Sequence, residues 1–344
     1  MDQNVHEILY NVIFSYIGFY DKHTFKKMNR YTNTIHVKDL MNVNDMKYLR
    51  NLDDNILNNY KNAIKLGAGN NPKIININHM IKLRILNACG NCGINDGGII
   101  DLINLEILKV DHNSKITNIN HMVRLKELDA YGTCGISNKS IINLDNLEIL
   151  NASCNSEITN INHLVKLKAL EARGSCGIND GGIINLNNLE ILSVDENSGV
   201  TNINHMVKLK ELYACGSCGI DDGGIINIDN LEILDAGNNP KITNINHMIQ
   251  LKELRAYGSC GIDDGGIINL NNLELLHAGD NSKITDINHM AKLKVLNASR
   301  TCGINSEGII NLKNLEEIYA IKRPEIFDVT HMKKLKKMHV CGIM

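Results

Sequence analysis

The sequence is poor in aromatic residues and has no excess of either charge. It contains no tryptophan, and only 4% of its residues are aromatic. A core without large rings has to be built from Leu, Ile, Val, Met and Ala, which suits thin, repeated layers. With 36 basic residues against 38 acidic ones the net charge is −2. The chain as a whole therefore has no electrostatic attraction for nucleic acid or for membranes.

Targeting segments are also missing from the sequence. No run of 18 or more apolar residues occurs, so no transmembrane helix is expected. The N-terminal residues have neither a basic region nor a small-residue cleavage site, so a secretory signal is not expected either. We predict a cytoplasmic or nuclear protein that is not secreted and whose thiols stay reduced.

What the sequence does contain is a repeat of 42 residues. Its marker is a histidine in an N-I-N-H-M phrase, which recurs at His79, His121, His163, His205, His247 and His289 and, in degenerate form, at His331. Each repeat divides into segments of 22 and 20 residues that begin L-x-x-L-x-(A/V), as at Leu125, Leu128 and Ala130. Turns this short bury their apolar residues only against neighbouring turns, so the copies must stack into a solenoid.

The L-x-x-L-x-A phrase followed by a turn with Asn or Cys resembles the leucine-rich repeat family, over roughly residues 50 to 344. The resemblance implies an α/β solenoid, a leucine-rich repeat horseshoe with parallel strands on its concave face. We assign residues 46–344 to this solenoid and residues 1–45 to a small helical head.

The head has apolar residues at helical spacing up to Gly18. Its phrase I-F-S-Y-I, followed by Asp21, Phe25 and Met28, resembles an F-box. The resemblance implies that the head binds the adaptor of a cullin–RING ubiquitin ligase through Leu9, Ile13, Phe14, Tyr16, Ile17, Phe25 and Met28. Alternatively, the head is only a cap over the first apolar layer of the solenoid.

The repeated His and Cys residues are predicted to be structural. Equivalent residues in successive repeats are two turns apart, or about 10 Å, which is too far for a shared zinc ion or for a disulfide. We expect the histidines to satisfy backbone groups of the neighbouring turn. The cysteines should point inward as small buried residues, at Cys92, Cys134, Cys176, Cys218, Cys260 and Cys302. The isolated C-x-x-C pairs do not form a four-cysteine zinc site, so we expect no metal and no cofactor.

The glycine-rich phrase G-I-D-D-G-G-I at residues 219–225 is likewise assigned to the scaffold. It lacks the alternating oxygen ligands and terminal Glu of a calcium loop, and no G-K-[S/T] follows as in a phosphate loop. We predict that its Asp, or Asn in other copies, caps a short outer helix or turn.

The informative positions are those that vary between otherwise matching repeats. They follow the second Leu of each segment and, by alternation along a strand, lie on the face opposite the buried Leu and Ala. The resemblance implies that this is the concave recognition face. We predict partner contacts centred on Tyr213, Arg255 and Tyr257, within the set Asp129, Tyr131, Glu171, Arg173, Tyr213, Asp235, Arg255, Tyr257 and His277. The alternative is that exposed positions drift without selection.

Two functions follow as hypotheses. The first is an F-box-type substrate receptor, which binds an adaptor through its head and a target protein through the concave face. The second is a stand-alone leucine-rich repeat scaffold or decoy whose head is only a cap. An enzyme is not expected, because no nucleophile, base and orienting group recur together. We expect a protein partner, and neither nucleic acid nor a membrane.

Overall fold

The computed structural model describes residues 39–40, 52–322 and 329–340. Most of the predicted head therefore lies outside the described residues. This applies to every residue predicted to bind an adaptor, namely Leu9, Ile13, Phe14, Tyr16, Ile17, Phe25 and Met28.

The chain divides into two compact units, residues 1–151 and 152–344. The first contains β1 (Asp39–Leu40), α4 (Asp54–Leu57), β2 (Lys65–Gly67), β3 (Ile85–Asn87), η2 (Asp96–Gly98), β4 (Ile107–Lys109), β5 (Glu127–Asp129), η3 (Asn138–Ser140) and β6 (Ile149–Asn151). The second contains β7 (Ala169–Glu171), α5 (Asp180–Ile183), β8 (Ile191–Ser193), β9 (Glu211–Tyr213), β10 (Ile233–Asp235), β11 (Glu253–Arg255), η4 (Asp264–Gly266), β12 (Leu275–His277), β13 (Val295–Asn297), η5 (Glu307–Ile309), β14 (Glu317–Tyr319) and β15 (Lys337–His339).

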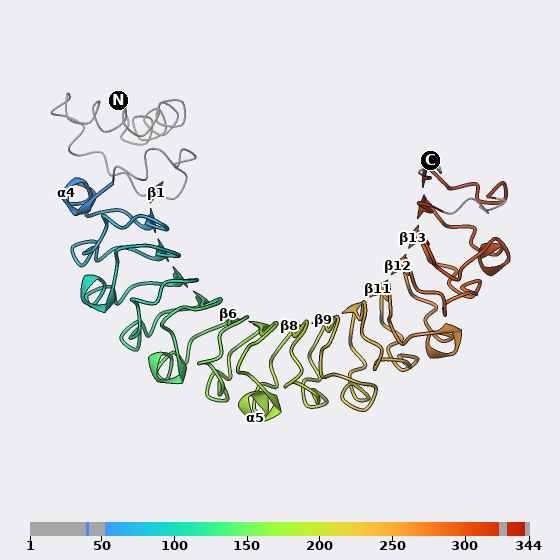
Figure 1. The fold of residues 1–344 in the computed structure, drawn as a ribbon, viewed down its shortest axis with the longest axis horizontal. Helices are drawn as coiled ribbons and strands as arrows, with labels where there is room; N and C mark the ends of the chain where they lie inside the picture. Colours follow the sequence, from blue (N-terminus) through green and yellow to red (C-terminus); the bar gives the residue numbers. More distant parts are fainter. Residues whose placement is uncertain (1–38, 41–51, 323–328, 341–344) are drawn as a thin grey trace, which may run out of the picture. The chain divides into compact units, whose positions relative to one another are not determined.

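Within each unit the strands are parallel and follow sequence order. The repeated leucines stay in register, so that Leu212 pairs with Leu234 and Leu234 pairs with Leu254. In each unit the strands line the inner side of a curve, and the short helices and turns lie on the outer side (Figure 1). In the first unit the sheet includes β1, which pairs with β2 and precedes residue 46. The predicted parallel-strand solenoid is therefore what the chain forms.

The core consists of aliphatic layers, as the scarcity of aromatic residues predicted. The central leucine of a typical strand, such as Leu234, is fully buried. Ile, Met and Ala from the turns complete each layer, and Tyr60 is the only aromatic residue buried within the described part of the chain. Each layer is closed only by its neighbours, so stability accumulates turn by turn.

The glycine-rich phrase caps the short outer helices and turns, links each to the next turn, and allows the two backbones to approach closely. The Asp263 carboxylate accepts the Gly266 N–H at 3.1 Å, which confirms the predicted capping role. The next residue, Asp264, reaches the following turn and accepts the Thr285 N–H at 2.6 Å and its hydroxyl at 2.5 Å. A Cβ atom on Gly266 would overlap the Thr243 carbonyl oxygen, so this close approach requires glycine.

The N-I-N-H phrase also links adjacent turns. Asn204 donates to the Gly223 carbonyl at 2.8 Å and accepts the Asn227 N–H at 2.9 Å. The histidine contacts a backbone carbonyl 22 residues earlier, at 3.0–3.3 Å, in His121, His205, His247, His289 and His331. The predicted structural role of these histidines is confirmed at those five positions.

Two buried polar columns alternate inside the turns. The predicted cysteines are buried, except that Cys176 is half-buried, and none of the nine cysteines in the described ranges forms a disulfide. The alternate turns carry buried asparagines, Asn71, Asn113, Asn155, Asn197, Asn239 and Asn281, which were not predicted. Asn239 donates to the carbonyls of Ala214 and Ile220 at 3.0 and 3.1 Å. The signal for them was present, because an Asn precedes the K-I-T or related phrase at the same 42-residue period.

Candidate binding surface

The strand face, defined here as the side of each sheet opposite the aliphatic core, carries the positions that vary. A typical three-residue strand buries its central leucine and leaves the residue on either side partly accessible, as in β9 and β11. Alternation along the strand produces this pattern. Each variable residue is therefore held on a short, regular strand whose position is set by the repeat.

The nine predicted contact residues all lie on strands or two residues after the end of a strand. Asp129 and Tyr131 belong to the first unit, where the Tyr131 ring packs edge-on against His112 with ring centres 5.2 Å apart. The other seven belong to the second unit, on β7 and β9 to β12 or just after β7 and β11: Glu171, Arg173, Tyr213, Asp235, Arg255, Tyr257 and His277. The second unit therefore brings most of the predicted site together.

One end of the site in the second unit is built around Asp195. Arg173 donates to the Ser193 hydroxyl at 2.5 Å, and the Ser193 hydroxyl donates to Asp195 at 3.2 Å. The Arg173 guanidinium also lies 3.6 Å from the same carboxylate. The backbone N–H of Cys215 donates to the other Asp195 oxygen at 2.9 Å. Neither Ser193 nor Asp195 was among the predicted contact residues.

The middle of the site is built around Asp235, which is only 7% exposed. Its carboxylate accepts the Gly237 N–H at 3.0 Å and the Cys215 thiol at 2.9 Å, and lies 3.6 Å from Arg255. The prediction treated Asp235 as a surface contact. Its burial instead gives it the role of holding the neighbouring side chains in place.

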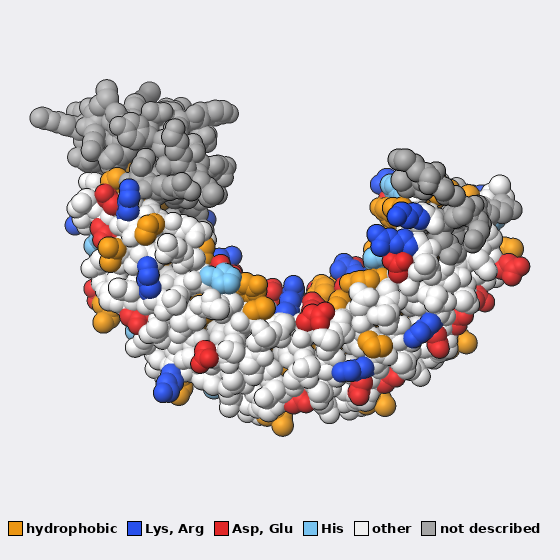
Figure 2. All heavy atoms as spheres, viewed as in Figure 1, with side chains coloured by type: hydrophobic (Ala, Val, Ile, Leu, Met, Phe, Trp, Pro, Cys, Tyr) orange, Lys and Arg blue, Asp and Glu red, His pale blue; other side chains and the backbone are white. Residues whose placement is uncertain are grey.

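The reason for this burial is Tyr257. Gly237 has no side chain, and a Cβ atom there would overlap the Tyr257 ring, so the ring lies directly against β10. On its other side Tyr257 stacks with His277, with ring centres 4.9 Å apart and an angle of 29° between the rings. The half-exposed Tyr213 donates to Glu211 at 3.1 Å, and Arg255 pairs with Glu253 at 2.6 Å. Figure 2 shows hydrophobic side chains, a class that includes Tyr and Cys, beside acidic and basic ones on this inner side.

The ionisation of these groups follows from their burial and their neighbours. Burial raises the pKa of the Cys215 thiol, and the adjacent Asp235 raises it further. Burial and the same carboxylate also raise the pKa of Tyr257. Burial lowers the pKa of His277, so this ring is mostly neutral at pH 7. The Cys215 thiol is therefore protonated at pH 7, and a protonated thiol is a poor nucleophile.

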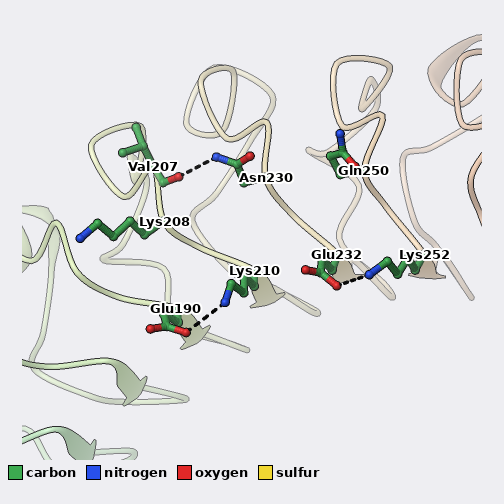
Figure 3. Close-up of a pocket in the computed structure, with 8 residues that line it drawn as sticks. All are labelled: Glu190, Val207, Lys208, Lys210, Asn230, Glu232, Gln250 and Lys252. Carbon is green, nitrogen blue, oxygen red and sulfur yellow. Dashed lines mark hydrogen bonds and ion pairs between the residues drawn. The ribbon is translucent and has the colours of Figure 1, made fainter.

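A shallow groove of about 390 Å³ lies beside this face (Figure 3). Two ion pairs cross its floor, Lys210 with Glu190 at 3.3 Å and Lys252 with Glu232 at 2.5 Å. Lys208 is also engaged, with Asn188 at 2.7 Å. The lining side chains pair along the solenoid and do not converge on a common point, so we do not assign a ligand to this groove. Its lining residues are Glu190, Val207, Lys208, Lys210, Asn230, Glu232, Gln250 and Lys252.

In the described ranges, no group of three or more His, Cys, Asp or Glu side chains is placed to hold a metal ion. Over the same part of the chain, no helix has both the length and the apolar character needed to cross a membrane.

Comparisons with known proteins define the fold. No protein-family model and no curated protein matches the sequence. The solved structure of the internalin InlF from Listeria monocytogenes strain 4b F2365 is 23% identical, with a TM-score of 0.52 over 72% of this chain and 83% of that one. The functional domain of InlJ from Listeria monocytogenes, which includes a cysteine ladder, is 18% identical, with a TM-score of 0.52 over 80% and 68%.

A third similar structure is TLR13 in complex with ssRNA13. It is 19% identical, with a TM-score of 0.52 over 86% of this chain, but the match spans only 57% of the TLR13 chain. All three structures are leucine-rich repeat proteins. The chain therefore has the leucine-rich repeat fold, as the sequence predicted.

Proposed function

We propose that the protein is an interaction scaffold that binds a target protein through the strand face of its second unit. One observation carries this proposal. The repeats agree at nearly every buried or turn position but differ at the strand-face positions, where Tyr213 lies on β9 and Arg255 and Tyr257 lie on or just after β11, one strand further along. Tyr and Arg are the side chains that most often anchor protein interfaces.

We further propose that residues 1–45 bind the adaptor of a cullin–RING ubiquitin ligase, which would make the protein an F-box-type substrate receptor in the cytoplasm or nucleus. The support for this half is the I-F-S-Y-I phrase at residues 13–17. A stand-alone scaffold or decoy, with the head acting only as a cap, is the competing function.

Affinity capture from cell extracts, read out by mass spectrometry, tests the first half. The double variant Tyr213→Ala/Tyr257→Ala should lose the protein that the unmodified chain retains, because it removes two anchors. The matched control is Ile184→Ala/Ile226→Ala, at exposed positions after the glycine-rich phrase, and it should retain that protein. Equal capture by both double variants would place the interface elsewhere.

Purified adaptor tests the second half. Ile13→Asp should abolish adaptor binding while capture through the strand face continues. If the adaptor does not bind the unmodified chain, the F-box role is wrong and the stand-alone scaffold remains. Single-stranded RNA belongs in the same assay, because one structural neighbour is a complex with it; specific RNA binding would contradict a protein target.

A further inference from the structure

One repeat departs from the others at a position that packs against the turn before it. This position is the third residue of the N-S-K-I-T phrase and its variants. It is a lysine in the repeats that contain Lys73, Lys115, Lys241 and Lys283. Glu157 and Gly199 take its place in the other two. At Gly199 the whole side chain is therefore missing.

The lysine at this position reaches back to a backbone carbonyl of the preceding turn. Lys115 Nζ donates to the Cys92 carbonyl at 2.9 Å, and Lys241 Nζ donates to the Cys218 carbonyl at 3.2 Å. The equivalent carbonyl in the repeat that lacks the lysine belongs to Cys176. Within the described ranges, no side chain donates a hydrogen bond to it.

The missing side chain leaves a cavity of about 530 Å³ between the turns that follow β7 and β8. Residues 174–179 and 196–199 line it, and Gly199 and Cys176 are among them. Its volume lies within the range of about 300–1,000 Å³ that is typical of ligand pockets. The Cys176 thiol is half-buried there. The equivalent thiols that precede a lysine are buried, at Cys92, Cys218 and Cys260.

The cavity favours a cation. Glu196 is the only charged residue among those that line it, and the equivalent residue in the next repeat is Asn238. Relative to the repeat with Asn238 and Lys241, this place has lost one positive charge and gained one negative charge. The Glu196 carboxylate accepts the Ser217 N–H at 3.1 Å and the Ser217 hydroxyl, and these bonds lower its pKa. The carboxylate is therefore ionised at pH 7.

The cavity also adjoins the strand-face site of the second unit. Arg173 directly precedes Gly174, and Asp195 directly precedes Glu196. The positive charge of Arg173 is already engaged, because its guanidinium lies 3.6 Å from Asp195 and 3.8 Å from Glu171. A protein bound to the strand face can thus place a side chain in the cavity.

We propose that this cavity binds a lysine side chain of the protein partner, whose ammonium group donates to the Cys176 carbonyl and pairs with Glu196. The partner's lysine takes the place that Lys241 of this chain occupies in the next repeat. A compact ammonium on a flexible stem suits a cavity lined by a carbonyl and a carboxylate. This inference rests on the proposed interaction function and adds the chemistry of one partner side chain.

Cys176 can report whether the cavity is filled, because its thiol lies in the cavity wall. The full chain is treated with N-ethylmaleimide, and alkylation of Cys176 is followed by mass spectrometry. The probe is a capped peptide with one lysine flanked by glycines, and the matched peptide carries Nε-acetyl-lysine. Only empty sites react, so the lysine peptide at millimolar concentration should slow alkylation by about twofold or more. The acetylated peptide should have no effect.

Gly199→Lys gives the chain its own occupant for the cavity. The N-S-K-I-T phrase at residues 113–117 shows that the turn accepts this residue, and a Cβ atom at Gly199 would come no closer than 3.3 Å to its neighbours. The variant should protect Cys176 without any peptide. The matched control, Gly199→Ala, leaves the cavity open, so the lysine peptide should still protect Cys176. Glu196→Gln should weaken that protection, because it removes the only charge in the lining.

In affinity capture from cell extracts, Gly199→Lys should lose the partner and Gly199→Ala should retain it. The inference is wrong if the lysine peptide leaves the alkylation of Cys176 unchanged, or if the acetylated peptide protects equally. Equal capture by the two Gly199 variants also overturns it. If Tyr213→Ala/Tyr257→Ala still abolishes capture in that case, the interaction function stands and the partner lysine is excluded. Failure of the unmodified chain to capture any protein would overturn the proposed function, and this inference with it.

Discussion

At the scale of single residues, the roles of the repeated side chains could be predicted better than those of the variable ones. The histidines and cysteines were assigned to the scaffold from spacing alone, and the contacts of His205 and the burial of Cys218 agree. The burial of Asp235 could not be predicted. It depends on the absence of a side chain at Gly237, on which the Tyr257 ring of the next turn rests. Gly237 and Tyr257 belong to different turns, so the sequence of one turn does not predict this contact.

The buried thiols make stability sensitive to alkaline pH. Burial raises the pKa of Cys218 and of Cys260 from 9.0 to about 11. The unfolded chain then loses these protons at lower pH than the folded chain does. The stability they contribute is complete below about pH 9 and falls as pH rises toward 11.

Urea unfolding measured at pH 7.5, 9.5 and 10.5 should therefore show a falling midpoint. The variant Cys218→Ala/Cys260→Ala should have a smaller fall over the same range. An identical pH dependence in both proteins would mean that these thiols titrate normally in the folded state.

At the scale of elements, the strands could be located from the sequence because the L-x-x-L-x-(A/V) pattern recurs in every segment. The segment beginning at Leu125 contains β5, and the equivalent segments contain the other strands. The outer elements are less uniform, since 3-10 helices, a short α-helix and plain turns occupy equivalent positions. Their hydrogen bonds nevertheless coincide, because Asp221 and Asp263 both accept the N–H of a glycine three residues later.

The buried asparagine of each alternate turn should be among the most costly side chains to remove. In Asn239→Ala the carbonyls of Ala214 and Ile220 and the N–H of Lys241 would lose their partner. Leaving buried polar groups unsatisfied costs about 1–3 kcal/mol. Asn187→Ala, at an exposed turn position, should cost less than about 0.5 kcal/mol. Urea unfolding of both variants measures the difference, and equal free energies of unfolding would rule out a special role for the buried column.

At the scale of the whole molecule, the repeat period predicts the stacking but not the head. The solenoid follows from residues that recur, so each copy supports the interpretation of the others. Residues 1–45 occur once, and their assignment rests on one phrase with nothing in the chain to compare it with. The variable strand-face residues could be located from the repeats, whereas their mutual contacts required coordinates.

The natural building unit should be two turns and not one. Deleting residues 199–240 joins Ser198 to Lys241 and recreates the N-S-K-I-T phrase found at residues 113–117. Deleting residues 197–216 removes one turn, together with the buried Asn197 and the lysine between Glu190 and Glu232. We expect the first protein to melt cooperatively near the unmodified one, and the second several degrees lower. Thermal melting followed by circular dichroism decides this, and similar melting temperatures for the two deletions would contradict it.

One position before each strand, Glu and Lys alternate from turn to turn, from Glu190 to Lys336. The charge pattern of the array therefore repeats every two turns. An exchange between two near-identical copies of the gene segment leaves every pairing intact only when it adds or removes an even number of turns. Each such event inserts or deletes about 10 Å of strand face. The strand face, which we propose as the recognition surface, can thus be lengthened, shortened or moved along the array by recombination alone, while point mutations at a few strand positions change its side chains.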